Sequence, residues 1–161
     1  MCPMDGSLVT PALYSKLGGP KKNDRMRRTD KIDCVFLTCN RSDFSFLAIV
    51  LQYSGIRMHR ARTLEEADFL LTVTEGTVLL SDVRFLDGYW LDALGMISAL
   101  HPQVASMVVS EEAEHPSLSE AYSVGACAVL RKPIVLDQAI EWIRVLDEAA
   151  RNRAVLLASP A

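Results

Sequence analysis

From Ile32 onward the sequence alternates between short, continuous apolar runs and segments whose apolar residues recur with a helical period. This pattern predicts five strands at residues 32–39, 56–61, 76–82, 103–110 and 126–133, followed respectively by helices at 40–55, 64–73, 89–100, 117–125 and 136–153. Strands that are apolar throughout are typical of a parallel sheet covered on both faces, because each parallel connection carries a helix across one face. The sequence therefore predicts the α/β class, with a doubly wound, five-stranded parallel sheet.

The residues before this alternating region differ from it in charge. Residues 1–31 contain seven Lys or Arg and three Asp or Glu, whereas the remaining 130 residues contain ten and seventeen. The first segment holds three prolines, three glycines and the string KKNDRMRR without any sustained apolar period. We therefore expect a disordered basic arm at 1–31, a folded domain at 32–153 and a C-terminal tail at 154–161, and we assign the arm no function.

Composition excludes several classes of protein. No apolar run approaches the roughly 18 residues needed to cross a bilayer, and the N-terminus lacks a basic start followed by an apolar block, so we expect a cytoplasmic protein without a membrane segment. The four cysteines, at 2, 34, 39 and 127, lack the paired spacing of a zinc site and are expected to be reduced thiols. A short basic tail on an acidic domain is more often solvated than bound to nucleic acid, so no nucleic-acid partner is expected.

Polar residues stand at the carboxyl ends of four predicted strands. Cys39 and Asn40 follow the first strand, Asp82 ends the third, Ser110 ends the fourth, and Lys132 ends the fifth. In doubly wound sheets the carboxyl ends of the strands meet at the edge where ligands bind. A carboxylate nucleophile, a hydroxyl donor and a fixed cation are the groups that transfer of a phosphoryl group to the protein requires. We therefore predict that these residues line one pocket.

With this ordered set of residues, segment 32–153 resembles the receiver domain of two-component response regulators, which has a flavodoxin-like fold. The resemblance rests on Asp82, on Ser110 28 residues later, and on Lys132 22 residues after that, followed by Pro133. It implies that Asp82 is the phosphoacceptor, that Ser110 is the hydroxyl that bonds a phosphoryl oxygen, and that Lys132 pairs with the phosphoryl group.

The sequence also departs from the receiver pattern. Receiver domains place two acidic residues after the first strand to hold magnesium, and the corresponding residues here are Cys39 and Asn40. A thiol and a carboxamide are poor magnesium ligands, so we expect the metal site to be largely lost and assign no cofactor. Arg84, two residues beyond Asp82, supplies a cation that can fold toward the vacated charge position. Val129 replaces the Tyr or Phe that receivers carry three residues before the strand-five lysine, so the usual aromatic relay is not expected.

These departures lead to an expectation for the charge of Asp82. With no magnesium and no second acid predicted nearby, Asp82 faces Lys132 and Arg84. We therefore expect Asp82 to stay ionised, with a lowered pKa, and we expect Asp82→Asn to destabilise the fold.

The last predicted helix carries two apolar lines. The first consists of Leu136, Ala139, Ile140 and Ile143, and the second of Trp142, Val145 and Ala149. The second line is either a contact surface for a partner or a homodimer, or part of one wide buried stripe, and the pattern leaves both open.

Two hypotheses for function follow, neither of which is a conventional enzyme. The first is a single-domain response regulator that accepts a phosphoryl group at Asp82 from a histidine kinase or phosphotransfer protein, within a phosphorelay. The second is a pseudo-receiver, a protein-interaction module that works without phosphorylation. Only eight residues follow Arg153, too few for a DNA-binding module, so under either hypothesis we expect output through a downstream protein partner.

Overall fold

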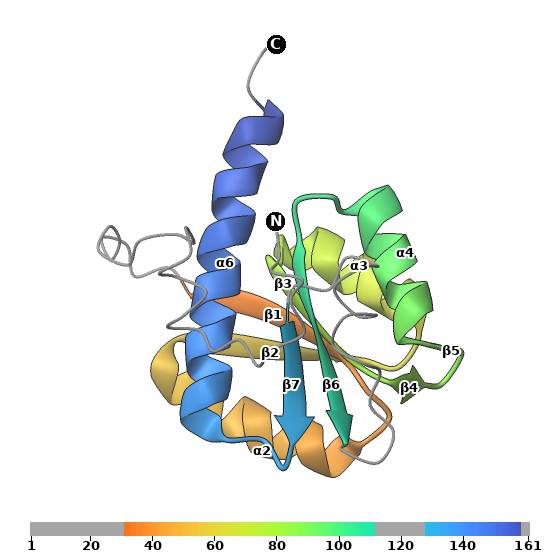
Figure 1. The fold of residues 1–161 in the computed structure, drawn as a ribbon, viewed down its shortest axis with the longest axis vertical. Coiled ribbons are helices and arrows are strands. Elements are labelled where there is room, and N and C mark those ends of the chain that lie inside the picture. The colour runs from red at the N-terminus through yellow and green to blue at the C-terminus, as the bar shows by residue number, and fades with distance from the viewer. Residues whose placement is uncertain (1–30, 112–127, 159–161) are drawn as a thin grey trace, which may run out of the picture.

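The computed structural model of the protein describes residues 31–111 and 128–158. Its main sheet has five parallel strands in the order β2-β1-β3-β6-β7 (Figure 1). The strands are β1 (Ile32–Leu37), β2 (Ile56–Ala61), β3 (Val78–Asp82), β6 (Ala105–Glu111) and β7 (Ala128–Lys132). Numbered along the chain, this order is 2-1-3-4-5, the order of flavodoxin-like sheets, so the predicted α/β fold is confirmed.

Helices cover both faces of the sheet, which explains why its central strand β3 is buried along its whole length, whereas the edge strand β2 carries charged residues. The helices are α2 (Arg41–Leu51), α3 (Leu64–Thr74), α4 (Trp90–Leu100) and α6 (Leu136–Ala158), with a short 3₁₀ helix at Gln52–Ser54. Helices α2 and α6 pack on one face through buried side chains that include Leu47 and Ile143. Helices α3 and α4 pack on the other face, with Leu71 and Ile97 in the core (Figure 1).

Capping side chains set the helix boundaries near the predicted positions. The side chain of Asn40 accepts a hydrogen bond from the backbone N–H of Asp43, and Thr63 Oγ1 accepts one from the backbone N–H of Glu66. Gly55 follows the 3₁₀ helix with φ of 78°, a left-handed conformation that glycine adopts at no steric cost. Asn40 and Thr63 are therefore the N-caps of α2 and α3, and Gly55 ends the helical segment after the first strand, close to the predicted helix boundaries at 40–55 and 64–73.

The centre of the sheet delivers Asp82 to the carboxyl edge. Strand β3 lies between β1 and β6 and is buried along its whole length. Its register with β1 pairs Ser81 with Leu37, so the next residue of each strand, Asp82 and Thr38, come to lie side by side. On the other flank Asp82 pairs with Val109 of β6.

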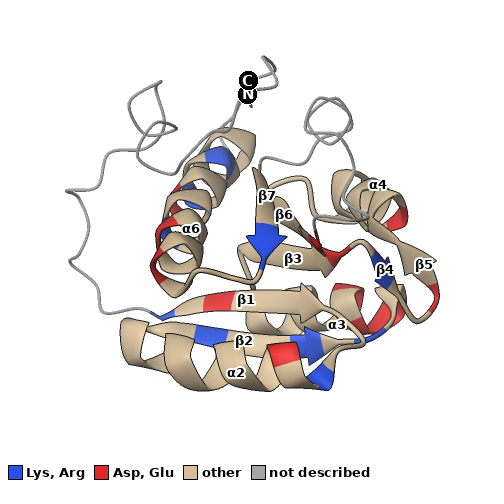
Figure 2. Ribbon diagram, turned by 60° about the horizontal axis from the view of Figure 1, so that its bottom comes forward, with Lys and Arg blue, Asp and Glu red and all other residues tan. Residues whose placement is uncertain are grey.

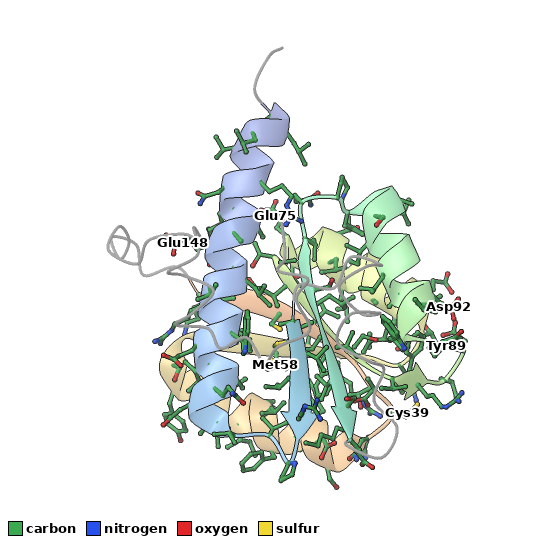
Figure 3. All side chains as sticks on the ribbon, viewed as in Figure 1. Cys39, Met58, Glu75, Tyr89, Asp92 and Glu148 are labelled. Atoms are coloured by element: carbon green, nitrogen blue, oxygen red, sulfur yellow. The ribbon has the colours of Figure 1, made fainter. Side chains whose placement is uncertain are left out.

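The segment after β3 forms an antiparallel hairpin that the sequence did not predict. It consists of β4 (Arg84–Phe85) and β5 (Gly88–Tyr89). The Asp92 carboxylate accepts a hydrogen bond from the backbone N–H of Tyr89, and Figure 3 shows these two side chains next to one another at the start of α4. Strands of two residues are too short to carry a periodic pattern, which is why this hairpin left no clear signal in the sequence.

Helix α6 differs from the prediction in its length and in its buried face. It continues to Ala158, five residues beyond the expected end at Arg153, and its last turns extend past the sheet (Figure 1). Trp142 is 2% exposed and belongs to the core, and Val145 packs against that core. The two apolar lines of this helix therefore form one wide buried stripe, and the alternative of a separate exposed surface at Trp142 is wrong.

Several predicted features lie outside the described residues. These are the basic arm before Lys31, the fourth predicted helix at 117–125, Cys2 and Cys127. Among the helices that the structure describes, none combines the length and the apolar character that spanning a membrane requires.

Candidate functional site

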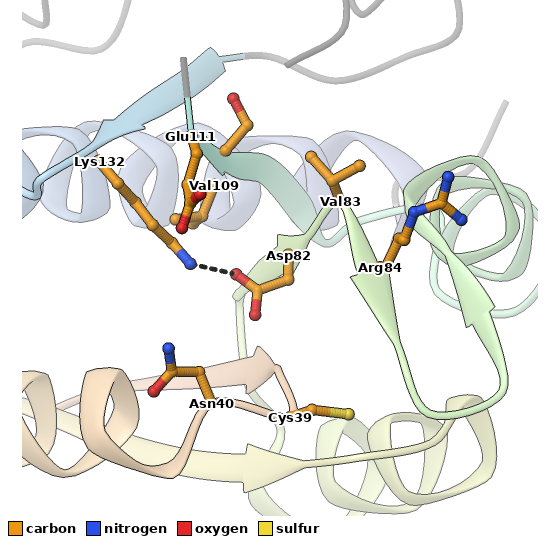
Figure 4. Close-up of a pocket in the computed structure, with 9 residues that line it drawn as sticks. Cys39, Asn40, Asp82, Val83, Arg84, Val109, Glu111 and Lys132 are labelled. Atoms are coloured by element: carbon orange, nitrogen blue, oxygen red, sulfur yellow. Dashed lines mark ion pairs between the residues drawn. The ribbon is translucent and has the colours of Figure 1, made fainter. Parts of the chain in front are cut away.

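The carboxyl ends of the strands converge on one pocket, as predicted. Figure 2 shows basic residues at the carboxyl end of β7 beside acidic residues at the ends of neighbouring strands. The residues that line the pocket are Cys39, Asn40, Asp82, Val83, Arg84, Val109, Ser110, Glu111 and Lys132. All six site residues named from the sequence are in this set, and Figure 4 shows Lys132 reaching from β7 toward Asp82 on β3.

The two oxygens of the Asp82 carboxylate have different environments. The residue is 7% exposed, so its carboxylate is largely removed from water. Oδ2 accepts a short hydrogen bond from Thr38 Oγ1, the hydroxyl of a fully buried residue. Oδ1 lies 3.4 Å from Lys132 Nζ in an ion pair, but it accepts no hydrogen bond from any described residue (Figure 4). Asp82 therefore has one oxygen that is bound by Thr38 and a second, buried oxygen that contacts Lys132 but accepts no hydrogen bond.

Lys132 is shared between two carboxylates. Its Nζ lies 3.0 Å from Asp43 Oδ2 on the first turn of α2, which is closer than its contact with Asp82. Burial acts to lower the pKa of Lys132, but the hydrogen bond to Asp43 and the charges of both carboxylates together raise the pKa above its usual value. Lys132 is therefore a firmly charged group, and its position depends on α2 as well as on β3.

Asp82 itself has a raised pKa, which corrects the expectation from the sequence. Burial raises the pKa and is the dominant cause, while the hydrogen bond from Thr38 and the charge of Lys132 act to lower it. The nearby carboxylate of Asp43 raises it further. The prediction of a lowered pKa was wrong because neither the depth of burial nor the second acid was recognised in the sequence.

Ser110 places an unpaired hydroxyl in the same pocket. The residue is 1% exposed, and its Oγ has no hydrogen-bond partner among the described residues. Buried hydroxyl groups are normally paired, so an unpaired one that lines a pocket is suited to bind an oxygen atom of a ligand. On the next strand, Val129 pairs in register with Val108 and packs beside the α4 cluster that contains Trp90, so no aromatic side chain occupies that position.

Arg84 lines the rim of the pocket without reaching Asp82. It is exposed on β4, and Figure 4 shows its guanidinium pointing away from the Asp82 carboxylate. The cation that does contact Asp82 is Lys132. The expectation that Arg84 folds toward Asp82, into the position of the replaced metal ion, is therefore not met in the structure.

The groups present do not fit a magnesium site of the receiver type. Cys39 is exposed and contributes a thiol at the end of the molecule where the strands finish (Figure 3), and the Asn40 side chain is already used in capping α2. The carboxylates of Asp43 and Asp82 both face the Lys132 ammonium. No group of three or more His, Cys, Asp or Glu side chains within residues 31–111 and 128–158 is arranged to hold a metal ion. A hard divalent cation prefers several oxygen ligands that are free to bind it.

Two residues of the site were missed in the sequence. Thr38 contacts Asp82 directly, whereas attention had fallen on Cys39 and Asn40, which follow it. A usable signal was present, because Thr38 is a polar residue directly after the continuous apolar run of β1. The pairing of Asp43 with Lys132, far away along the chain, gave no sequence signal.

Comparisons with known proteins agree on the fold. No protein-family model and no curated protein sequence matches the chain. Among solved structures, a signal receiver domain from Vibrio parahaemolyticus is similar, with a TM-score of 0.70, 12% identity, and coverage of 80% of this chain and 99% of that one. The beryllofluoride-activated NtrC4 receiver domain dimer gives a TM-score of 0.66 at 22% identity, with coverage of 73% of this chain and 98% of the other. A response regulator receiver protein from Pseudomonas putida gives 0.63 at 22% identity, with coverage of 71% and 96%. The protein therefore has the fold of response regulator receiver domains.

Proposed function

We propose that this protein is a receiver module of a two-component phosphorelay, with Asp82 as the residue that accepts the phosphoryl group. One observation carries this proposal. A single pocket at the carboxyl edge of the sheet combines Asp82, whose Oδ1 accepts no hydrogen bond from the described residues, the Lys132 ammonium 3.4 Å from that oxygen, and the unpaired hydroxyl of Ser110. The donor in this proposal is a phosphohistidine of a histidine kinase or phosphotransfer protein.

The three groups have separate roles in the transfer. The ionised Asp82 attacks the phosphorus with an electron pair of Oδ1, and a new O–P bond forms. The P–N bond of the phosphohistidine breaks, and its electron pair stays on the imidazole nitrogen of the donor. Lys132 offsets negative charge on the phosphoryl oxygens, and the Ser110 hydroxyl donates a hydrogen bond to one of them. No step uses a metal ion, because the donor set does not fit one.

The proposal is tested with phosphoramidate, a small phosphoryl donor that contains a P–N bond. We expect the protein to gain one phosphoryl group, detected by intact mass, in a bond that base and hydroxylamine both cleave, as is typical of an acyl phosphate. Asp82→Asn should abolish the label. Asp147→Asn is the matched control, since Asp147 is 8% exposed, close to the 7% of Asp82, but lies outside the pocket. Labelling that persists in Asp82→Asn would assign the chemistry to another residue.

A second candidate function is a pseudo-receiver that binds a partner without phosphorylation. Two observations favour it: Cys39 and Asn40 replace the acidic pair, and Lys132 lies nearer to Asp43 than to Asp82. Under this hypothesis phosphoramidate leaves the unmodified protein unlabelled, and Asp82→Asn does not change its affinity for the partner. Labelling at Asp82 together with a changed affinity would exclude this candidate.

We further infer that output passes through protein contact, with either a downstream partner or a second copy of the chain. The NtrC4 receiver domain, whose fold is similar, forms a dimer, and this motivates a test of oligomeric state. Light scattering before and after phosphoramidate treatment distinguishes a homodimer from a protein that acts only through other partners.

A further inference from the structure

We propose that Thr38 is the residue that positions Asp82 for phosphoryl transfer, by binding Oδ2 and leaving Oδ1 as the oxygen that attacks phosphorus. This inference rests on the proposed function for its chemistry. The geometry that supports the inference does not depend on the proposed function, and one of the two tests described below does not depend on it either.

The orientation of the Thr38 hydroxyl is fixed from two sides. Its oxygen accepts a hydrogen bond of 2.9 Å from the backbone N–H of Asn40. A hydroxyl has a single proton, and here that proton is donated to Asp82 Oδ2. The backbone N–H of Thr38 donates to the carbonyl of Ala61, which holds this end of β1 against β2. Thr38 is fully buried, so water does not compete for these contacts.

This arrangement gives the two oxygens of Asp82 different tasks. Oδ2 is held by Thr38 from β1, and Oδ1 faces the pocket beside Lys132 from β7. The other charged groups around the carboxylate are Asp43 from α2, which shares Lys132, and Glu111 and Arg84 on the pocket lining. None of these binds Oδ2, so the Thr38 hydroxyl holds Oδ2 while Lys132 pairs with Oδ1, and these two contacts fix the rotation of the carboxylate. A nucleophile held in one orientation reacts faster than one that rotates freely.

The decisive experiment compares Thr38→Val, which keeps the shape and removes the hydroxyl, with Thr38→Ser, which keeps the hydroxyl. The rate of labelling by phosphoramidate is measured across a series of pH values. We expect Thr38→Val to react roughly ten- to a hundredfold more slowly, with its pH profile displaced to higher pH, and we expect Thr38→Ser to restore most of the rate. Equal rates in the unmodified protein and in Thr38→Val at every pH would overturn the proposal.

Controls separate a positioning role from a general effect on folding. Thr77→Val removes the equivalent hydroxyl from the other buried Thr–Asp contact, at the opposite end of β3, and should leave the labelling rate unchanged. If Thr38→Val does not fold, Thr38→Ala supplies a smaller variant without the hydroxyl for the same comparison. Circular dichroism and urea midpoints confirm that each variant is folded before its rate is interpreted.

A second measurement keeps this inference apart from the proposed function. If the unmodified protein takes no label from phosphoramidate, the phosphoacceptor proposal fails, but the contact of Thr38 with Asp82 is still tested by carboxyl carbon NMR. We expect Asp82 to titrate at higher pH in Thr38→Val than in the unmodified protein and in Thr38→Ser, because the lost hydrogen bond favoured the ionised form. Identical titration in all three proteins would overturn the role assigned to Thr38.

Discussion

Asp82 and Asp147 are buried to the same depth near opposite ends of strand β3, and each accepts a short hydrogen bond from a threonine. They differ in what binds the rest of the carboxylate. Thr77 donates to Asp147 Oδ1 at 2.5 Å, and Arg151 Nε donates to both oxygens, at 3.0 and 2.9 Å. Asp82 has an oxygen, Oδ1, that accepts no hydrogen bond from the described residues.

We interpret this difference as one between a structural carboxylate, Asp147, and the carboxylate that we propose to be reactive, Asp82. Arg151 lies one helical turn beyond Asp147, so this ion pair forms within α6. The hydrogen bond from Thr77 to Asp147 then connects α6 to the start of β3. The charged partner of Asp82 comes instead from β7 and is shared with Asp43 on α2. A buried polar atom left unpaired costs stability, and such atoms cluster where a ligand or a reaction later supplies the missing contact.

The largest effect that this comparison predicts is loss of stability in Asp147→Ala. The substitution leaves the Thr77 hydroxyl without its acceptor and removes the partner of Arg151. We expect the free energy of unfolding to fall by about 2 kcal/mol, since a buried and fully hydrogen-bonded carboxylate is lost. Urea denaturation at neutral pH measures the change. A midpoint equal to that of the unmodified protein would show that the satisfied carboxylate contributes nothing to the fold.

Asp82→Asn is expected to act in the opposite direction. Burial disfavours the charged form of Asp82, so at neutral pH its ionisation costs stability in the folded state. The amide removes that charge, and Lys132 keeps Asp43 as a partner. We expect a gain on the order of 1 kcal/mol in the free energy of unfolding. The sequence had led us to expect destabilisation, and a lower urea midpoint for Asp82→Asn would restore that earlier interpretation.

The pH dependence of this gain follows from the raised pKa of Asp82. A raised folded-state pKa means that folding favours the protonated form, so the stability contributed by Asp82 is fully present below its ordinary pKa of 3.8. That contribution is lost as the pH rises through the higher folded-state pKa. The advantage of Asp82→Asn should therefore be small in acid and should grow toward neutral pH. Urea midpoints of both proteins at a series of pH values measure it, and an advantage that shrinks as the pH rises would contradict the raised pKa.

The sequence predicted the sheet well because its inner strands are rich in consecutive apolar residues and the helices between them begin at clear caps. The sequence predicted the end and the buried face of α6 less well, because the hydrophobic periodicity carries little information about either. Helix α6 continues beyond Arg153 through AVLLA, a segment of good helix-forming residues with no buried face to reveal it. The two apolar lines on α6 looked separable, because a helical projection does not reveal how wide a groove the helix occupies.

At the site, the residues that end the strands were identifiable from order and spacing, and the electrostatics were not. Asp82 and Lys132 end their strands and Ser110 lies one residue before the end of β6, so the parallel topology alone brings them together. Thr38 was missed because the prediction selected the two residues that follow it, Cys39 and Asn40. Only the register between β1 and β3 shows that Thr38 lies beside Asp82. The sign of the pKa shift depends on burial and on Asp43, and both are properties of the folded chain.

The smallest expected effect is that of magnesium, which distinguishes this pocket from an acidic metal site. A ligand raises the free energy of unfolding by RT ln(1 + [L]/Kd), so 1 mM magnesium contributes about 1.4 kcal/mol at a Kd of about 0.1 mM and under about 0.1 kcal/mol at a Kd of about 10 mM. The carboxylates of Asp82 and of the nearby Asp43 already pair with Lys132, so we expect the weaker case and no measurable shift in melting temperature. The double variant Cys39→Asp with Asn40→Asp adds two carboxylates on the pocket lining, and aspartate at position 40 still caps α2. Magnesium should therefore raise the melting temperature of the variant. A clear increase in the unmodified protein would show that magnesium displaces Lys132 from its ion pairs with Asp43 and Asp82.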